Sequence, residues 1–379
     1  MITLTKKQSE AVKIMATNYT KKEPITVISG FAGTGKSSII NYFIENNDLM
    51  DKTRFVTFTG KASLVLQNKG LPATTIHRLI YDAFRNKRTG KFIFVKKEVL
   101  DWRIKLLVVD EVSMVPANLL RDLMSFNIPI VALGDPGQLE PIGEDNGLLK
   151  QPDFFLDEIH RQAADNSIIR LSMLVREGRA LPIITEDPFV KVLDKKDLNI
   201  GMLQWADQIL CGKNNTRRTI NADMRKALGH SGTYPNVGEK AICLRNYWDN
   251  INDSEDPLIN GTIGMVTHVK KPKYDDPTNI LFEDVLMNVR ADYSDSPWEH
   301  VQTDSNIFKG FAPFSKQHPR SNKMYHEFDF GYAITVHKAQ GSEFEKVLVF
   351  EERLGGGSHA RWLYTAITRA SDRIVIIRG

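Results

Sequence analysis

Short runs of apolar, mostly β-branched residues alternate with helix-length stretches over the first 180 residues of the chain. The runs lie at 25–29, 54–59, 106–109 and 128–133. Since parallel strands are joined by helical crossovers, this alternation predicts an α/β domain built on a parallel sheet. The stretch 84–97 interrupts the pattern. Its Thr89-Gly90 pair is followed by a β-prone segment at 91–95, so we expect a small inserted hairpin.

A second α/β pattern begins near residue 203. Its expected elements are strands at 208–211, 241–244, 346–350 and 374–377 and helices at 216–228 and 360–370. Between 270 and 326 the composition shifts to Pro, Asp, Asn, Ser and scattered aromatic residues, with β-like pieces at 278–282 and 285–289. We expect this stretch to form a small β subdomain inserted into the second α/β domain.

The composition narrows the class of protein. The chain has 379 residues, of which 42% are hydrophobic and 25% are charged, and it contains only two Cys. Two Cys cannot staple a chain of this length, and no apolar run approaches the ~18 residues of a membrane span. The first residues carry no apolar segment like that of a signal peptide. A secreted disulfide scaffold, a membrane protein and a disordered chain are excluded, and a reduced, cytoplasmic compartment is expected.

The charge distribution says more than the net charge of +4. The segment 84–97 contains no acidic residue and six basic ones: Arg85, Lys87, Arg88, Lys91, Lys96 and Lys97. Such a run is either a solvated face or a contact for a polyanion. Only neighbouring chemistry can favour the second reading.

The strongest chemical signal is GFAGTGKS at 30–37, which follows an expected strand and precedes an expected helix at 37–45. In this context glycines let backbone N–H groups and the helix N-terminus face phosphate oxygens. Lys36 can then reach the β- and γ-phosphates of a nucleotide, and the Ser37 hydroxyl can hold Mg²⁺. The alternative is an ordinary Gly-rich turn. The predicted nucleotide-contacting residues are Gly30, Ala32, Gly33, Thr34, Gly35, Lys36, Ser37 and Ser38.

An acidic pair follows the apolar run at 106–109. We expect Asp110 to hold Mg²⁺ through water and Glu111 to act as the general base that polarises the attacking water. Alone, such a pair would be the end of a strand entering a loop. Beside a phosphate loop, it indicates nucleotide hydrolysis.

The order of further motifs resembles superfamily 1 helicases. DEVSM (110–114), GDPGQLEPI (134–142), VHKAQGSEF (336–344) and LYTAITRA (363–370) look like motifs II, III, V and VI of that superfamily. FTGKASLVL (58–66), TIHRLI (75–80) and LDEIHRQ (156–162) are similar to its RecD-like and phage Dda-like branch.

The resemblance implies an α/β fold with two RecA-like domains. The expected boundaries are 1–83 with 98–178 for the first domain and 179–269 with 327–379 for the second. The hairpin at 84–97 and a β-barrel-like, SH3-like insertion at 270–326 complete the division. The resemblance further implies ATP and Mg²⁺ as cofactors, single-stranded DNA and a duplex fork as partners, and 5′-to-3′ travel.

The resemblance also implies the setting of the protein. A monomer without membrane attachment is expected in the cytoplasm of a bacterium or a phage-infected host, working with replication or recombination proteins. Two rival functions stay open: an RNA-directed helicase or translocase without strong unwinding, and a binding module with a decayed nucleotide site.

Individual roles follow from the same resemblance. Gln138 would sense the γ-phosphate, and Arg161 and Arg369 would act as arginine fingers, a role that suits an always-charged, bidentate group. Gly341 would offer backbone near the γ-phosphate, and Glu343 would bind the ribose hydroxyls.

Gln8 has two interpretations. In the resembled family a Gln at this place reads the adenine edge, yet Thr5 and Gln8 also form the sequence signature of a capping box. Both roles could hold only if the Gln8 side chain were shared between the cap of the helix and the adenine.

The residues expected at DNA are Lys61, Thr75, His77 and His337, whose side chains can bind phosphates without reading sequence. Phe92 and Phe94 share one face of a hairpin strand and could stack on a base pair at the fork. The alternative for these two is a packed hairpin with a wet basic rim.

Overall fold

The computed structural model describes residues 4–85, 92–140, 144–158, 166–253, 257–271, 284–291, 294, 296–313, 316, 325–354 and 359–379. The chain divides into two compact units. Unit 1 comprises Met1–Asp82, Phe94–Asp197 and Gln340–Gly379, and unit 2 comprises Ala83–Ile93 and Leu198–Ala339. The domain boundaries expected from the sequence stay a prediction.

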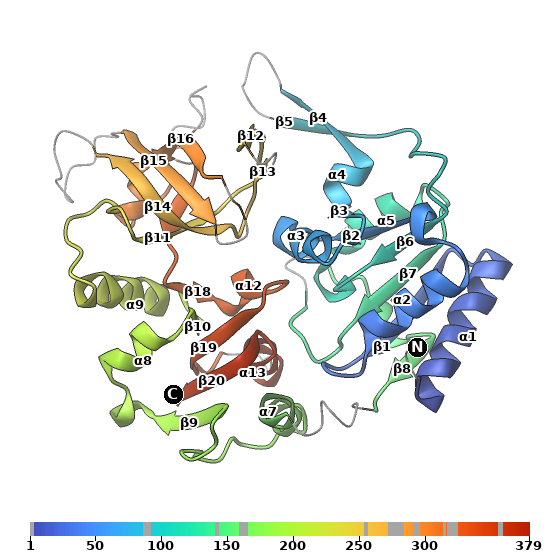
Figure 1. Cartoon of the computed structure of the whole chain (residues 1–379), viewed down its shortest axis with the longest axis horizontal. Coiled ribbons are helices and arrows are strands. Elements are labelled where there is room, and N and C mark those ends of the chain that lie inside the picture. The colour runs from blue at the N-terminus through green and yellow to red at the C-terminus, as the bar shows by residue number, and fades with distance from the viewer. Residues whose placement is uncertain are drawn as a thin grey trace. The chain divides into compact units, whose positions relative to one another are not determined.

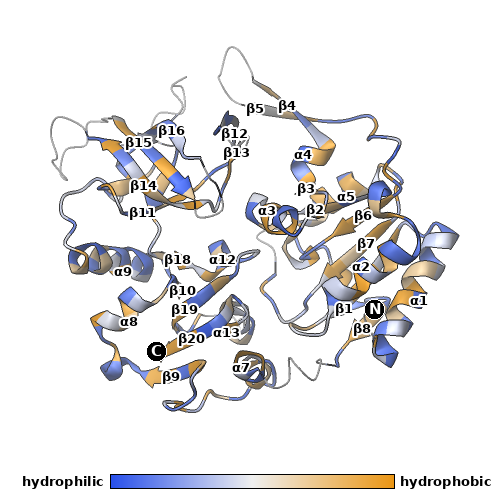
Figure 2. Ribbon diagram, in the orientation of Figure 1, coloured by the Kyte–Doolittle hydropathy of each residue, from blue (hydrophilic) through white to orange (hydrophobic). Residues whose placement is uncertain are grey.

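Unit 1 contains a six-stranded sheet in which every pair of neighbouring strands is parallel. The spatial order is β3 (Ala73–Thr75), β2 (Thr53–Thr57), β6 (Leu106–Val109), β7 (Ile130–Gly134), β1 (Ile25–Gly30) and β8 (Phe154–Leu156). All four strands predicted in the first half are present, as β1, β2, β6 and β7. Strands β6 and β7 are buried along their whole length, as parallel strands covered on both faces must be, and Figure 2 shows both in the hydrophobic colour.

Helices cover both faces of this sheet, and Figure 1 shows α1 and α2 side by side. The helices of unit 1 are α1 (Lys6–Lys21), α2 (Lys36–Asn46), α3 (Gly60–Asn68), α4 (Ile76–Ile80), α5 (Ala117–Met124), α7 (Ser167–Arg176) and α13 (His359–Ile367). Successive residues of a strand face opposite ways. Ile28 and Val108 therefore join the core that holds α1 and α2, whereas Val27 and Leu107 join the core that holds α5.

The rest of unit 1 adds three parallel strands. They are β19 (Phe344–Phe350), β20 (Ala370–Arg378) and β9 (Val190–Asp194). Helices α7 and α13 pack against each other, and both pack on β20. The strands expected at 346–350 and 374–377 and the helix expected at 360–370 are thus present. The α/β class with parallel sheets is confirmed.

A two-stranded sheet interrupts the first α/β pattern, where the sequence predicts a hairpin. It consists of β4 (Tyr81–Arg85) and β5 (Phe92–Lys96), and the connection at 86–91 lies outside the described residues. The first arm begins three residues before the expected start, because the apolar Ile80 ends α4 and Tyr81 already has extended backbone.

Unit 2 combines a small parallel pair with an antiparallel sheet. The parallel pair is β10 (Gln208–Cys211) and β18 (Ala333–Thr335), and the helices are α8 (Ile200–Trp205), α9 (Asn214–Ala227), α10 (Ser305–Phe308) and α12 (Val336–Ala339). The antiparallel sheet has the order β16 (Trp298–Asp304), β15 (Asp284–Ala291), β14 (Ile263–Lys270), β11 (Lys240–Cys243) and β17 (Phe328–Phe330). A separate pair is formed by β12 (Tyr247–Ile251) and β13 (Pro257–Leu258).

The strand expected at 241–244 exists as β11, but it joins the antiparallel sheet and not a parallel one. The chain reverses between β12 and β13, which pair antiparallel, and a turn at Asn260-Gly261 then leads into β14. Gly261 has φ of 89°, a conformation that favours glycine, and its N–H donates to Cys243 O at 2.9 Å. From this turn β14 runs antiparallel along β11. The sheet draws in residues on both sides of 270–326, and the piece expected at 278–282 lies outside the described residues.

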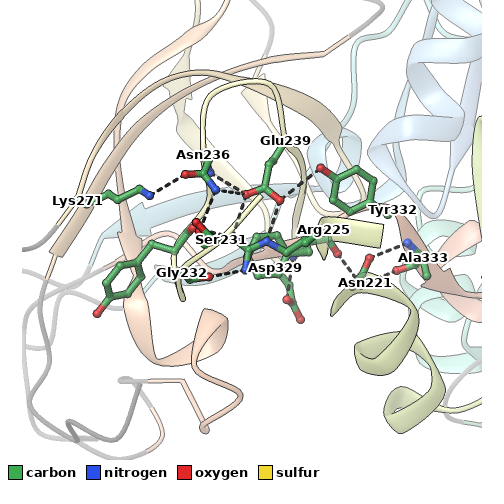
Figure 3. A network of polar contacts seen from close by, with 12 residues as sticks. Asn221, Arg225, Ser231, Gly232, Asn236, Glu239, Lys271, Asp329, Tyr332 and Ala333 are labelled. Atoms are coloured by element: carbon green, nitrogen blue, oxygen red, sulfur yellow. Dashed lines mark hydrogen bonds and ion pairs between the residues drawn. The ribbon is translucent and has the colours of Figure 1, made fainter. Parts of the chain in front are cut away.

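A buried ion pair ties α9 to the segment before β11 (Figure 3). Arg225 Nε and Nη2 donate to Glu239 at 2.8 and 3.0 Å, and the Glu239 side chain is fully buried. The Asn236 N–H and the Tyr332 hydroxyl also donate to this carboxylate, at 2.8 and 3.4 Å. Because the charge has partners on several sides, this buried pair is compatible with a stable fold.

In the part of the chain that the structure describes, no helix is long and apolar enough to cross a membrane.

Candidate nucleotide site

The phosphate loop connects β1 to α2. Gly33 and Gly35 have φ of 78° and 81°, and this left-handed backbone curls the loop over the start of α2. Thr34 is buried and its hydroxyl donates to Phe31 O at 2.8 Å, which tightens the curl. The loop therefore has the strand–turn–helix context in which backbone N–H groups bind phosphate.

Lys36 is the cation of this loop. Its Nζ donates to Gly30 O at 2.7 Å and to Phe31 O at 2.9 Å, so the ammonium group lies inside the curl. Burial lowers the pKa of Lys36, while three carboxylates oppose that shift. Ser37 is exposed at the start of α2, and Ser38 is half-buried.

The three carboxylates are Asp110, Glu111 and Asp135. Burial raises the pKa of each of them, and Lys36 counteracts the shift in every case. Buried carboxylates gathered around one lysine can accommodate a further cation, because a cation favours their ionised form. The oxygen donors of Ser37 and Asp110 are of the type that Mg²⁺ prefers, so the residues fit the expected metal.

Glu111 has an uncommon backbone. Its φ of 51° and ψ of 48° are left-handed for a residue that is not glycine, so the chain turns sharply where β6 ends. The Glu111 N–H donates to Asp110 Oδ1 at 2.9 Å. Within the described part of the chain, the buried Glu111 Oε2 has no hydrogen-bond partner. An ionisable oxygen without a partner is available to a water molecule or a ligand.

Two other predicted residues lie against Glu111. Arg369 is buried, places Nη1 3.6 Å from Glu111 Oε1, and donates to Ser342 O at 3.1 Å. Gly341 has φ of 72°, and a Cβ there would lie 3.0 Å from Thr59 Oγ1 and 3.3 Å from Glu111 Oε2. The structure therefore brings Glu111, Arg369 and the Gly341 backbone together, from segments that are far apart in the sequence.

Gln138 is buried on the loop that follows β7. Its Oε1 has no hydrogen-bond partner among the described residues. The same loop begins with Asp135, whose Oδ2 accepts from the Tyr364 hydroxyl at 2.6 Å. That hydroxyl also accepts from the Ala32 N–H of the phosphate loop at 3.0 Å. Sequence reasoning missed Asp135 and Tyr364, although both lie inside motifs that it used.

Gln8 forms the expected capping box. Its Oε1 accepts from the Thr5 N–H at 3.0 Å, and Thr5 Oγ1 accepts from the Gln8 N–H at 3.3 Å. The Gln8 amide also donates to Thr34 O of the phosphate loop at 3.2 Å. The capping role is confirmed and the adenine contact stays a prediction, now with a side chain that reaches the loop.

The residues expected at DNA have varied environments. Lys61 lies 4.5 Å above the Phe344 ring, and Thr75 is buried with its hydroxyl capping α4 through the Arg78 N–H at 3.2 Å. Burial lowers the pKa of His77 in unit 1 and of His337 in unit 2, so both rings favour the neutral form.

His77 belongs to an aromatic cluster at the base of the hairpin. Its ring centroid lies 5.7 Å from that of Tyr81 and 6.4 Å from that of Phe94, and Phe94 is 49% exposed. The Phe92 side chain and Arg161 lie outside the described residues. Glu343 is exposed.

Two family models match the chain. Residues 3–194, just over half of the chain, match the model described as an AAA domain, and residues 330–377 match that of the UvrD-like helicase C-terminal domain. The second match covers the segment that supplies Gly341, Tyr364 and Arg369.

The chain is similar in sequence to several curated proteins. The ATP-dependent RecD2 DNA helicase of Deinococcus radiodurans is 27% identical over 376 residues, which cover 92% of this chain and 46% of that protein. The ATP-dependent DNA helicase Dda of Enterobacteria phage T4 is 30% identical over 192 residues, which cover 46% of this chain and 43% of that protein. The chain thus spans less than half the length of either relative.

A solved structure shares the fold. It is a Pif1 helicase from Bacteroides in complex with ADP-AlF3 and ssDNA, with a TM-score of 0.55 and 18% identity. The match covers 99% of this chain and 92% of that chain.

Proposed function

We propose that the chain hydrolyses ATP to move along single-stranded DNA and to separate duplex DNA. The premise is that the chain belongs to the AAA-domain family and is a superfamily 1 helicase of the RecD, Dda and Pif1 type. One observation carries the proposal: Lys36, Glu111 and Arg369 converge on a single site in which buried charges of both signs face one another.

Hydrolysis would use the chain's own residues as follows. Glu111 Oε2 accepts a proton from the attacking water, whose oxygen bonds to the γ-phosphorus while the bond to the bridging oxygen breaks and ADP leaves with the electron pair. Arg369 donates to the phosphoryl oxygens as their charge develops, and Lys36 holds the β- and γ-phosphates. Mg²⁺, held by Ser37 and Asp110, would neutralise phosphate charge when bound.

The remaining contacts of the site complete the proposal. Gln138 senses the γ-phosphate, Gly341 offers backbone beside it, and Glu343 binds the ribose. Gln8 reads adenine, and Arg161 serves as a second arginine finger. The Gln8 amide beside the phosphate loop supports the adenine contact.

The nucleic-acid side rests on the hairpin and the residues near it. We propose that Lys61, Thr75, His77 and His337 contact the strand, and that Phe92 and Phe94 meet the base pair at the fork. The half-exposed Phe94 ring, in a hairpin rich in Lys and Arg, supports this role. We further propose that the domains have the boundaries expected from the sequence and that the protein is a monomer. It would act together with replication or recombination proteins in the cytoplasm of a bacterial or phage-infected cell.

The decisive experiment measures ATP hydrolysis with and without single-stranded DNA, beside matched RNA. Wild-type protein should be stimulated by DNA. Lys36→Ala should reduce turnover by orders of magnitude, because the loop loses the cation aimed at the phosphates. Glu111→Gln should bind ATP yet fail to hydrolyse it, because an amide cannot accept the proton. Wild-type turnover in either variant contradicts the site, and stronger stimulation by RNA contradicts the substrate.

A further inference from the structure

The Tyr364 hydroxyl is hydrogen-bonded on two sides inside unit 1. It accepts from the Ala32 N–H of the phosphate loop at 3.0 Å and donates to Asp135 Oδ2 at 2.6 Å. Tyr364 is 1% exposed and Asp135 is 3% exposed. Burial and the neighbouring carboxylate raise the pKa of Tyr364, so the phenol keeps its proton and remains a donor.

Asp135, which accepts this hydrogen bond, lies on the loop that carries Gln138. Asp135 Oδ1 accepts from the Gly137 N–H at 2.8 Å, and a Cβ on Gly137 would lie 3.0 Å from Tyr364 Cε1, so the ring packs against this backbone. The residue after Tyr364 also holds the loop, because Thr365 Oγ1 accepts from the Leu139 N–H at 3.0 Å. Residues of α13 thus contact this loop on both sides of Gln138.

Arg369 lies two residues after the C-terminal end of α13, close to Tyr364 and Thr365 in the sequence. Arg369 Nε donates to Thr365 O at 3.2 Å, and its guanidinium lies beside Glu111. The short segment 364–369 therefore contacts the phosphate loop and the Gln138 loop, and it supplies the Arg369 side chain.

We infer that Tyr364 is a positioning residue for ATP hydrolysis, whose hydroxyl aligns the phosphate loop with the loop that carries Gln138. This inference rests on the proposed function. Lys36 and the other N–H groups of the loop bind phosphate without the phenol. Loss of the hydroxyl should therefore spare ATP binding and impair the alignment that matters in the transition state.

The test compares Tyr364→Phe with a matched control, Tyr332→Phe. Tyr332 is likewise buried and donates to a buried carboxylate, Glu239, but this contact lies within unit 2. Both changes remove one oxygen atom and leave one carboxylate with a lost donor. Steady-state kinetics with saturating single-stranded DNA and thermal melting are measured for both variants.

Tyr364→Phe should lower kcat by roughly 10- to 100-fold, the range expected for one lost buried hydrogen-bonded link, and leave KM for ATP within about threefold. Tyr332→Phe should keep wild-type kcat. Wild-type kcat in Tyr364→Phe overturns the inference. So does a parallel change of kcat and KM with a melting temperature well below that of Tyr332→Phe, because that pattern marks a structural role.

A second variant keeps the inference testable if Tyr364→Phe does not fold. Asp135→Asn retains an oxygen acceptor but weakens the link to the phenol, and it should also lower kcat more than it raises KM. In the double variant the two losses of kcat should be less than additive, since both changes break the same hydrogen bond between Tyr364 and Asp135. Fully additive losses contradict the inference. If wild-type protein hydrolyses no ATP, the proposed function itself fails, which is a different result.

Discussion

At the scale of single residues, Glu111 shows how opposing effects set the state of a base. Burial raises its pKa, and the neighbouring Asp110 adds to that rise, whereas Arg369 and Lys36 lower it. A general base works in its ionised form. In the proposed mechanism Arg369 would therefore have two separable tasks, which are to keep Glu111 ionised and to donate to the phosphoryl group.

Two substitutions separate these tasks. Arg369→Ala removes the opposing charge, so the pKa of Glu111 rises further. As the pH is lowered, this variant should therefore lose activity at a higher pH than the wild-type protein does. The acid limb of the kcat/KM profile should move to higher pH, and kcat should fall by about 10³-fold. Arg369→Lys keeps the charge but not the fork, so its kcat should fall while its acid limb stays near that of wild type. Equal limbs in all three proteins would refute this account.

Gln8 permits a test of two roles that share one side chain. Thr5→Ala and Gln8→Ala both break the capping box, and each should destabilise the fold by about 1 kcal/mol. Only Gln8→Ala should weaken the preference for ATP over GTP, because Thr5 does not reach the phosphate loop. Melting curves and KM values for both nucleotides decide the matter. An unchanged preference in Gln8→Ala leaves capping as its role.

At the scale of elements, the hairpin β4–β5 is anchored by its base. Phe94 packs edge-on against Tyr81, the Tyr81 hydroxyl donates to Asp122, and Lys96 Nζ donates to Ser125 Oγ at 3.0 Å. These contacts hold the base of the hairpin to α5 and to Ser125, which follows that helix.

Deleting Asn86–Lys96 with a short Gly linker should abolish strand separation and leave DNA-stimulated ATP hydrolysis largely intact, because the described residues of the hairpin make none of the contacts that build the nucleotide site. A finer pair is Phe94→Ala and Val95→Ala, two neighbours that are both 49% exposed. Phe94→Ala should slow unwinding roughly tenfold through lost stacking, and Val95→Ala should not. Normal unwinding by the deletion variant would leave the hairpin as a surface insertion with no role at the fork.

At the scale of the whole molecule, the direction of travel is the property furthest from any single residue. Helicases of either polarity use the same phosphate loop and arginine fingers, so the expectation of 5′-to-3′ movement comes from the resemblance of 58–66, 75–80 and 156–162 to one branch of the superfamily.

Duplexes with a single-stranded tail on one end test this expectation. The protein should unwind a duplex with a 5′ tail and fail on one with only a 3′ tail, at equal ATP hydrolysis on both. The reverse preference would place the chain in the other branch and undermine the DNA roles proposed for Lys61, His77 and His337.

Much of this protein is determined by local sequence. The apolar runs at 25–29 and 106–109 predict β1 and β6 because burial on both faces demands continuous hydrophobic residues. Gly33 and Gly35 predict the loop, since only glycine adopts that backbone without strain, and an acidic pair after a buried strand predicts Asp110 and Glu111 at its edge.

Other features depend on which distant segments pack together, and only the tertiary structure decides these. Nothing near 241–244 says that the strand pairs antiparallel with β14, because pairing depends on the chain reversal between β12 and β13 and on β17, which lies far along the chain at Phe328–Phe330. Nor could a local pattern reveal that Tyr364 reaches Ala32 and Asp135. A hydroxyl becomes a link only when the fold buries it between a donor and an acceptor, and burial of that kind is a property of packing, not of residue type.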